Sequence, residues 1–430
     1  MWIMKHRIDL IKTVYIILTI IMLFTCQVLR FYRFIDVYTC SIAILVAGAI
    51  GLITYIIDKI INVKKIDIYD ILIIILVIFG IISTIYAINQ KVALFGTDNR
   101  NEGLLVLITY YIIFLVTKSI NNKKYKNIII NAILIYGLLH TLYGICQYFR
   151  INAIFKIPII KKRYYSTGLE INPNFFATIA IVSLSIALSK SLINKEKDSI
   201  IYTGITPIFF MGVIVSGAMS ANLTLVIIIP ILLIILAFSK PKIKTTIIKL
   251  IYIVLSSILC FNLFNNIDNN YLVSQFNKTQ EEINNVAHGT FKDEYGTGRI
   301  YIWRNALDLS SKNLINGIGI DNFLYGYDKE NRLRDMKNGF YIDKVHNEYL
   351  QKLVTEGIFS LITYMLLLLL LFIKSIKKIT KNKDTLLITL FISFLTYAIQ
   401  AFFNISVICV APLFYILMGL LASEAKNEST

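Results

Sequence analysis

Long runs of apolar residues, separated by short polar connections, extend over most of the chain. A membrane-spanning helix needs about 20 mostly apolar residues. Because these runs are continuous rather than alternating, they predict helices and not transmembrane β-strands. We therefore expect an all-α polytopic integral membrane protein with about twelve transmembrane helices. The predicted spans lie at about 9–29, 37–57, 67–88, 102–119, 126–149, 174–192, 199–219, 221–238, 243–263, 349–373, 384–404 and 406–423.

The spans divide the chain into three parts. Transmembrane helices 1–9 are expected within residues 1–263, and transmembrane helices 10–12 within residues 349–430. Residues 264–348 between them have the composition of a soluble segment and are close to neutral overall. Loops of this length are usually functional. We expect residues 264–348 to form one large extracytoplasmic loop with interfacial helices.

The composition excludes the common soluble classes. Hydrophobic residues make up 57% of the chain and charged residues 16%, and the mean hydropathy is +0.68. A soluble globular chain has about a quarter charged residues. The five cysteines all fall inside predicted spans and form no Cys-x-x-Cys pair, so we interpret them as small apolar residues.

The basic residues follow the topology. Lysines concentrate in alternate connections, such as those at residues 118–126 and 374–383. Because cytoplasmic loops carry such an excess, the sequence predicts a multi-pass protein of the cell membrane with both termini cytoplasmic. The net charge of +17 is thereby explained largely by topology in a lipid bilayer, and it does not indicate a nucleic-acid partner.

One predicted outer segment, residues 150–173, opposes this rule because it is strongly basic on the translocated side. Statistical scatter in a short loop is one interpretation. The favoured one is an anion site, for a phosphate or pyrophosphate at the outer leaflet. The segment contains Arg150, Lys156, Lys161, Lys162 and Arg163 against the single acid Glu170.

A second candidate region lies inside the 264–348 segment. From Arg299 to Leu307 the spacing places Ile300, Trp303 and Leu307 on one helical face. A helix lying in the membrane interface would hold Trp303 at headgroup level, with Arg299 and Arg304 reaching toward phosphate. An ordinary amphipathic helix packed inside the loop domain explains the pattern equally well.

His346 is the histidine with the most suggestive surroundings. It is one of four histidines in the chain and lies on the predicted outer face with basic and aromatic neighbours. A solvated or capping residue is the alternative to a catalytic base. The sequence contains no His-Glu-x-x-His motif, no metal-spaced His/Cys cluster and no Walker A loop. A reaction or transport without metal, cofactor or ATP is therefore expected.

Several short motifs occur in a fitting order between residues 95 and 360 and resemble the O-antigen ligase and O-antigen polymerase superfamily. These proteins are polytopic membrane glycosyltransferases with a large extracytoplasmic loop late in the chain. The matching motifs are Phe95-Gly96-x3-Arg100-x2-Gly103, Ser166-Thr167-Gly168-x3-Asn172-Pro173-Asn174, Arg299-x3-Trp303, Gly317-x-Gly319, His346-Asn347-Glu348-Tyr349-Leu350 and Gly357.

The resemblance implies a GT-C-like hexosyltransferase. Its donor would be an undecaprenyl-pyrophosphate-linked glycan, its acceptor a hydroxyl of a glycan or glycolipid, and it would need no metal. His346 and Arg299 are then the implied catalytic residues. The residues expected to bind substrate are Arg100, Arg163, Arg304, Trp303, Asn347, Tyr349 and Asn174.

One departure concerns a turn between two middle spans. Ligases tend to carry a Ser-Arg pair there, whereas this chain has no arginine from Ser216 to Ala221. Arg163 or Arg100 is a candidate replacement for that charge. A lipid-linked glycan flippase or another secondary transporter remains the alternative function, although transporters usually place their polar sites near the membrane midplane and often show repeats.

Overall fold

The computed structural model describes residues 2–62, 65–151, 165–193, 197–239, 243–267, 271–327 and 342–426. Regular structure in these ranges is helical, without strands, which confirms the all-α polytopic fold. Ten of the described helices are long and apolar enough to cross a membrane. They are α1 (Trp2–Phe31), α2 (Val37–Asn62), α3 (Ile68–Ile85), α6 (Lys123–Tyr148), α7 (Pro173–Ile193), α8 (Ser199–Ser216), α9 (Met219–Ser239), α10 (Ile243–Ile267), α16 (Ile358–Lys381) and α17 (Thr385–Phe402).

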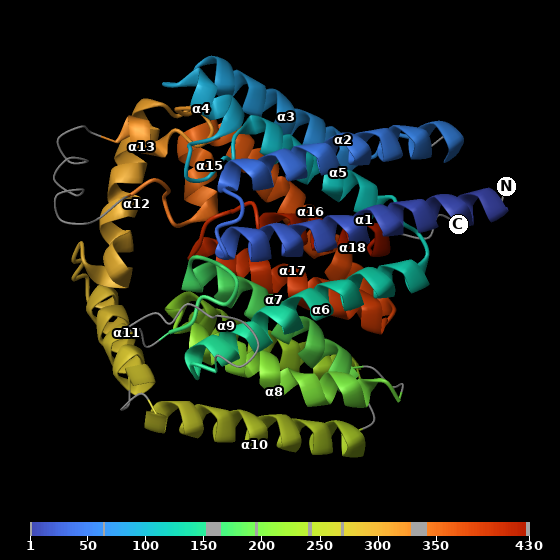
Figure 1. Ribbon diagram of the computed structural model, residues 1–430, viewed down its shortest axis with the longest axis vertical. Coiled ribbons are helices and arrows are strands. Elements are labelled where there is room, and N and C mark those ends of the chain that lie inside the picture. Colours follow the sequence, from blue (N-terminus) through green and yellow to red (C-terminus); the bar gives the residue numbers. More distant parts are fainter. Residues whose placement is uncertain are drawn as a thin grey trace.

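Two shorter apolar helices, α5 (Leu104–Lys118) and α18 (Ala411–Glu424), complete the twelve predicted apolar segments. The long helices lie side by side, and α1 begins at the same end of the bundle at which α18 ends (Figure 1). At the opposite end, α11 (Tyr271–Ala287) and α12 (Tyr295–Lys312) run across the bundle (Figure 1). The loop segment is thus concentrated at one end of the molecule.

Small residues allow the helices to approach closely. Helix α7 is almost completely buried and rich in alanine and serine. A Cβ atom added to Gly137 of α6 would lie 1.9 Å from the Ser183 hydroxyl of α7, and one on Gly419 of α18 would lie 1.8 Å from the Thr117 hydroxyl of α5. Such contacts drive helix association in lipid, where the hydrophobic effect does not favour it.

The span expected at 349–373 begins later than predicted. Residues Glu348–Glu356 form a separate short helix, α15, and the spanning helix α16 begins at Ile358. Gly357 separates them with φ 84°, and a Cβ atom there would lie 2.0 Å from the Ile315 carbonyl oxygen. Helix α15 cannot enter lipid as an apolar span because it carries Lys352, whose ammonium bonds the Glu356 carboxylate.

Helix α12 packs through a face that includes Ile302, Ala306 and part of Trp303. Ile302 and Ala306 are buried in a small core with Phe323 and Val354, whereas Leu307 is 54% exposed. This packing fits an amphipathic helix inside the loop domain. A turn precedes this helix, because residues 296–298 all have positive φ angles and the regular helix starts at Arg299.

Candidate active site

His346 occupies a backbone position that its neighbours impose. Its φ is +56°, a left-handed conformation that non-glycine residues rarely adopt. On one side, the Val345 N–H donates to the Gln351 side chain (2.8 Å), and the Val345 carbonyl accepts from the Trp303 indole (3.1 Å). On the other side, Asn347 begins α15 by accepting the Leu350 N–H (3.0 Å). Strain held in this way is typical of functional positions.

An ion pair anchors the segment that carries His346. The Arg100 guanidinium donates two hydrogen bonds to Asp343, at 2.7 and 3.0 Å, in the bidentate geometry that makes such pairs strong. Burial lowers the pKa of Arg100, but its contacts with Asp343 outweigh burial and raise the pKa above its usual value. Arg100 is therefore committed to Asp343, and the ring of Phe175 lies 5.9 Å from its guanidinium carbon.

A second buried cation, Lys344, also holds the segment that carries His346 in place. The Lys344 ammonium lies 3.0 Å from Glu102 and 3.0 Å from Asp321. Asp321 also accepts hydrogen bonds from the N–H (2.7 Å) and hydroxyl (3.0 Å) of Thr97. Burial lowers the pKa of Lys344, but the two carboxylates outweigh it and keep the pKa above its usual range. Removing one partner of such a buried set is costly.

Glycines shape the loop that presents these partners. The loop follows α4 (Gln90–Phe95), and Gly96 has φ 95°. A Cβ atom on Gly96 would lie 2.2 Å from the Glu102 nitrogen, and one on Gly103 would lie 2.5 Å from the Gly96 nitrogen. The first resemblance motif is thus a closed loop that fixes Arg100 and Glu102.

Arg299 differs from the other cations because no acid pairs with it among the described residues. Its guanidinium donates to the Gly296 carbonyl and the Thr297 hydroxyl, both at 2.9 Å. Its Nε atom is buried without a hydrogen-bond partner in the described part of the chain. Burial lowers the pKa of Arg299 from its usual value. A guanidinium without a counter-ion is suited to an anionic ligand.

Arg299 lines a cavity of about 310 Å³ between the loop helices and the bundle. Helices α11 and α12 contribute one wall, including Glu282, Arg299 and Trp303. Met219 and Ser220 contribute the other wall, and they belong to the turn in which the resemblance would place an arginine. Arg299 therefore faces the cavity that this turn lines. Arg100 does not line this cavity. Arg163 lies outside the described residues.

Burial, aided by nearby positive charges, keeps the ring of His346 neutral. Burial lowers the pKa of His346 to about 4, and the nearby Arg299 contributes further, while Asp343 opposes the shift. The Arg299 charge is therefore close enough to act on the imidazole. A neutral imidazole at pH 7 has a free lone pair, which a general base requires.

The other expected substrate-binding residues make mainly structural contacts. Asn347 caps α15, and the Tyr349 hydroxyl donates to the Ala398 carbonyl of α17 at 2.6 Å. Trp303 contacts Phe402 edge-on at 5.6 Å between ring centroids. Arg304 points outward on an exposed side, where it pairs with Asp293 at 2.9 Å. The structure thus brings His346, Arg299, Arg100 and Trp303 to one region.

Asn174 lies at the start of α7, below the loop region. Its N–H donates to the Asn172 side chain at 2.8 Å, and its carbonyl accepts from Asn404 at 3.2 Å. Asn404 and Thr178, which also bond each other at 3.0 Å, connect α7 to the end of α17. Asn174 therefore belongs to a polar contact between two spans.

Sequence reasoning did not single out Glu348 as a site residue. Its carboxylate accepts from the Tyr364 hydroxyl at 2.9 Å, while its second oxygen is buried without a hydrogen-bond partner in the described chain. Burial raises the pKa of Glu348 to about 7. A buried acid two residues from His346 is a further ionisable group of the site. Its position directly after the Asn347 cap was the available signal in the sequence.

The comparisons with known proteins agree with the motifs. Residues 206–365 match the family model of O-antigen ligase. The match includes Arg299, Trp303, His346 and Gly357, but not the Arg100 loop. A search of the curated proteins and a search of the solved structures give no significant match. The likeness to GT-C folds therefore stays a prediction.

The family match, the described helical bundle and the loop helices agree in order and position. They support a multi-pass membrane enzyme of the glycan-transferring kind. Over residues 206–365, this chain is similar to the O-antigen ligase family.

Proposed function

We propose that the protein transfers or polymerises a glycan from an undecaprenyl-pyrophosphate-linked donor onto an acceptor hydroxyl at the outer face of the cell membrane. The observation that carries this proposal is a buried, neutral His346 within the electrostatic influence of Arg299, which has no acid partner among the described residues. One group can accept a proton, and the other can hold the charge of a leaving diphosphate.

The reaction is a displacement at the anomeric carbon. His346 takes the proton of the acceptor hydroxyl, whose oxygen forms the new glycosidic bond. The bond between the anomeric carbon and the diphosphate oxygen breaks, and the electron pair leaves with the diphosphate. Arg299 stabilises that charge by charge-assisted hydrogen bonds. Direct attack inverts the anomeric configuration, and NMR of the product checks it; a retained configuration contradicts a single displacement.

Substrate binding is expected to tune the base. In the free protein, burial lowers the pKa of His346, and Arg299, Arg100 and Lys344 lower it further. A bound diphosphate brings negative charge to the same region, and this offsets the cations and raises the pKa of His346 toward neutrality. His346 then becomes a stronger base when the donor is in place. The kcat profile should accordingly lose activity at a higher pH than the kcat/KM profile as pH falls.

The proposed orientation places α11 and α12 outside the cytoplasm. Lysines gather at the end of the bundle that holds both termini, and the rule for cytoplasmic loops assigns this end to the cytoplasm. The 264–348 segment then meets lipid-linked glycans on the outer leaflet, with residues 1–263 and 349–430 supplying the membrane part.

A reconstituted assay tests transfer directly. Purified protein in liposomes receives a lipid-diphosphate-linked glycan and an acceptor, and new glycosidic bonds are measured by mass spectrometry. We expect bond formation with the wild type and with His288→Ala, an exposed histidine of the same loop segment, and loss with His346→Ala. Movement of the donor across the bilayer without any new bond would contradict the proposal and favour a flippase.

A further inference from the structure

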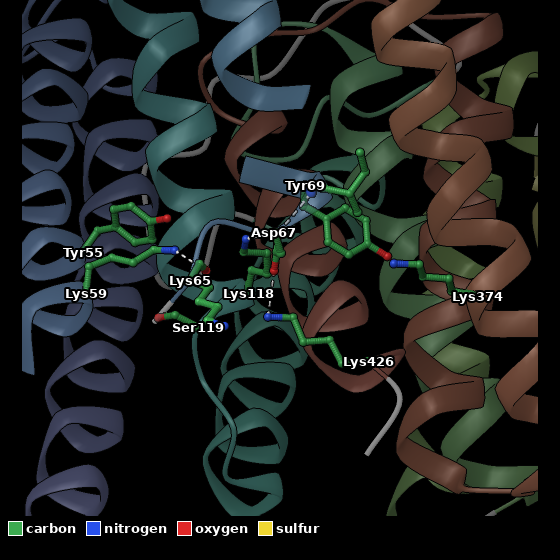
Figure 2. Close-up of a pocket in the computed structure, with 10 residues that line it drawn as sticks. Tyr55, Lys59, Lys65, Asp67, Tyr69, Lys118, Ser119, Lys374 and Lys426 are labelled. Atoms are coloured by element: carbon green, nitrogen blue, oxygen red, sulfur yellow. Dashed lines mark hydrogen bonds and ion pairs between the residues drawn. The ribbon is translucent and has the colours of Figure 1, made fainter. Parts of the chain in front are cut away.

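A second cavity lies where α2 ends and α3 begins, at the end of the bundle opposite α11 and α12 (Figure 1). Figure 2 shows the residues that line it. Its volume is about 620 Å³, twice that of the Arg299 cavity. The ends of α2, α3, α5 and α16 meet around it. Its lining includes five lysines, Lys59, Lys65, Lys118, Lys374 and Lys426.

Two acids partly neutralise this lysine pocket. Asp67 lies 2.7 Å from the Lys118 ammonium and 3.0 Å from that of Lys426. Asp70 lies 2.9 Å from the Lys59 ammonium and also contacts Lys118. The five lysines therefore share two carboxylates, so the pocket keeps an excess of positive charge.

The excess positive charge comes from Lys65 and Lys374, because neither forms an ion pair with an acid among the described residues. The Lys374 ammonium lies over the ring of Tyr69, 4.7 Å from its centroid. The Tyr69 side chain is 1% exposed, and its hydroxyl has no hydrogen-bond partner in the described chain. Figure 2 shows Tyr69 and Lys374 on one side of Asp67, with Lys59 and Lys65 on the other. The pocket thus offers ammonium groups and an unused buried hydroxyl.

The rim of the pocket is apolar. Ile68, which lines the pocket, is 41% exposed. The lysines stand at the ends of membrane-spanning helices, which is the depth at which lipid phosphates lie. Topology alone would explain lysines at this end, but not their convergence around one cavity, where Lys118 is only 3% exposed.

We propose that the lysine pocket binds a phosphate-bearing anion, and that its ligand is the headgroup of an anionic phospholipid in the adjacent leaflet. The phosphate oxygens accept hydrogen bonds from Lys374 and the Tyr69 hydroxyl. Lys65 adds positive charge from the other side of Asp67, and the acyl chains lie along Ile68. A free phosphate shares the headgroup chemistry but makes no use of the apolar rim. This site is independent of the proposed glycan transfer.

Native mass spectrometry of the purified full chain with added phosphatidylglycerol tests the site. The pocket variant Lys65→Gln/Lys374→Gln removes the two lysines without an acid partner. The matched control Lys377→Gln/Lys381→Gln removes the same charge from exposed positions of α16. Because the pocket variant loses an ammonium hydrogen bond to the phosphate and a second positive charge inside the pocket, we expect it to bind the first phosphatidylglycerol about 30-fold more weakly. The control should bind like the wild type.

A competition experiment and one further variant distinguish the two possible ligands and allow for misfolding of the lysine variant. Inorganic phosphate or pyrophosphate that displaces phosphatidylglycerol would support the phosphate site but assign it to a soluble anion; no displacement supports the lipid. Tyr69→Phe removes one hydroxyl and keeps the ring, so it should weaken binding even if the lysine variant unfolds. Equal binding by the wild type, Tyr69→Phe and both double variants would overturn the proposal.

Discussion

Burial affects His346 and Arg299 differently, and both effects suit the proposed reaction. Burial keeps the imidazole neutral, whereas it leaves the guanidinium charged without an acid partner in the described chain. A buried charge without a counter-ion disfavours folding. Such a residue is retained where a ligand supplies the missing charge. Its cost to stability is then balanced by its role in function.

Replacing Arg299 tests this conflict. We expect Arg299→Ala to lower kcat by roughly 10²–10³-fold, as for the loss of one oxyanion-stabilising donor. Thermal stability should stay the same or rise, because an uncompensated charge is removed. Arg299→Lys keeps the positive charge but loses the planar guanidinium, so its kcat should lie between those of the wild type and Arg299→Ala. The exposed Lys312 of the same helix provides the control Lys312→Ala. Equal turnover in Arg299→Ala and wild type would exclude the assigned role.

Glu348 gives a prediction about stability and pH. Its pKa is raised to about 7 in the folded protein from an ordinary value near 4.5. The folded state therefore binds its proton more tightly than the unfolded state, and this stabilisation is lost as pH rises through about 7. We expect Glu348→Gln to be more stable than wild type at pH 8, with the difference shrinking at pH 5.5.

Thermal unfolding at both pH values measures this effect. The control Glu281→Gln replaces an exposed acid on α11 and should keep the wild-type pH dependence. A Glu348→Gln variant that follows the wild-type curve at both pH values would show that Glu348 is not protonated near neutrality.

Helix α15 is the element that sets the position of His346. It begins at the Asn347 cap and ends at Gly357, where the 317–319 turn closes over its last carbonyls. The Ile318 N–H donates to the Val354 carbonyl and the Gly319 N–H to that of Thr355, both at 3.0 Å. The Gly317-x-Gly319 motif and Gly357 therefore both form the C-terminal end of α15.

The cap itself can be separated from a substrate contact. Asn347→Ala removes the acceptor for the Leu350 N–H and should cost about 1 kcal/mol of stability along with activity. Asn347→Asp keeps an oxygen acceptor and should preserve folding and most turnover. Normal unfolding of Asn347→Asp with turnover as low as that of Asn347→Ala would instead assign the amide to substrate binding.

The sequence predicted the elements well where apolar runs were long, and less well where a helix changed direction. The expected span 349–373 missed the break at Gly357, because the apolar run of α16 follows α15 without a polar linker. The sequence also did not show that Ile302 and Ala306 of α12 would be buried, since they pack on residues distant in sequence. Periodicity describes one helix and does not show which face a neighbour covers.

The partners of the site were harder to predict than its centre. His346 and Arg299 stood out by motif, but the contacts of Arg100 with Asp343 and of Lys344 with Glu102 join residues more than 240 positions apart. No spacing in the sequence reports such pairs. Arg100 was expected to bind substrate, yet its place in the structure is beside Asp343.

At the scale of the whole molecule, the two ends of the bundle differ in chemistry. One end holds the loop helices with His346 and Arg299, and the other holds the lysine pocket and both ends of the helical chain (Figures 1 and 2). The rule for basic loops predicts that the second end faces the cytoplasm. The reaction and the anionic lipid site would then face opposite sides of the membrane.

Cysteine labelling in intact cells tests this orientation. His288→Cys places an exposed thiol on the loop side, and Lys377→Cys places one at the lysine side. A membrane-impermeant maleimide should label the first in intact cells and the second only after permeabilisation, with wild type as the blank for the native cysteines. The reverse pattern would invert the proposed topology.

The most direct test of the central claim is the lipid-linked glycan that accumulates in cells when His346→Ala replaces the wild type. If His346 is the base of glycan transfer, undecaprenyl-linked material should accumulate at normal protein levels, as single units for a polymerase and as long chains for a ligase. The His288→Ala control should keep the wild-type pattern. An unchanged glycan profile in His346→Ala, with normal expression, would contradict the account.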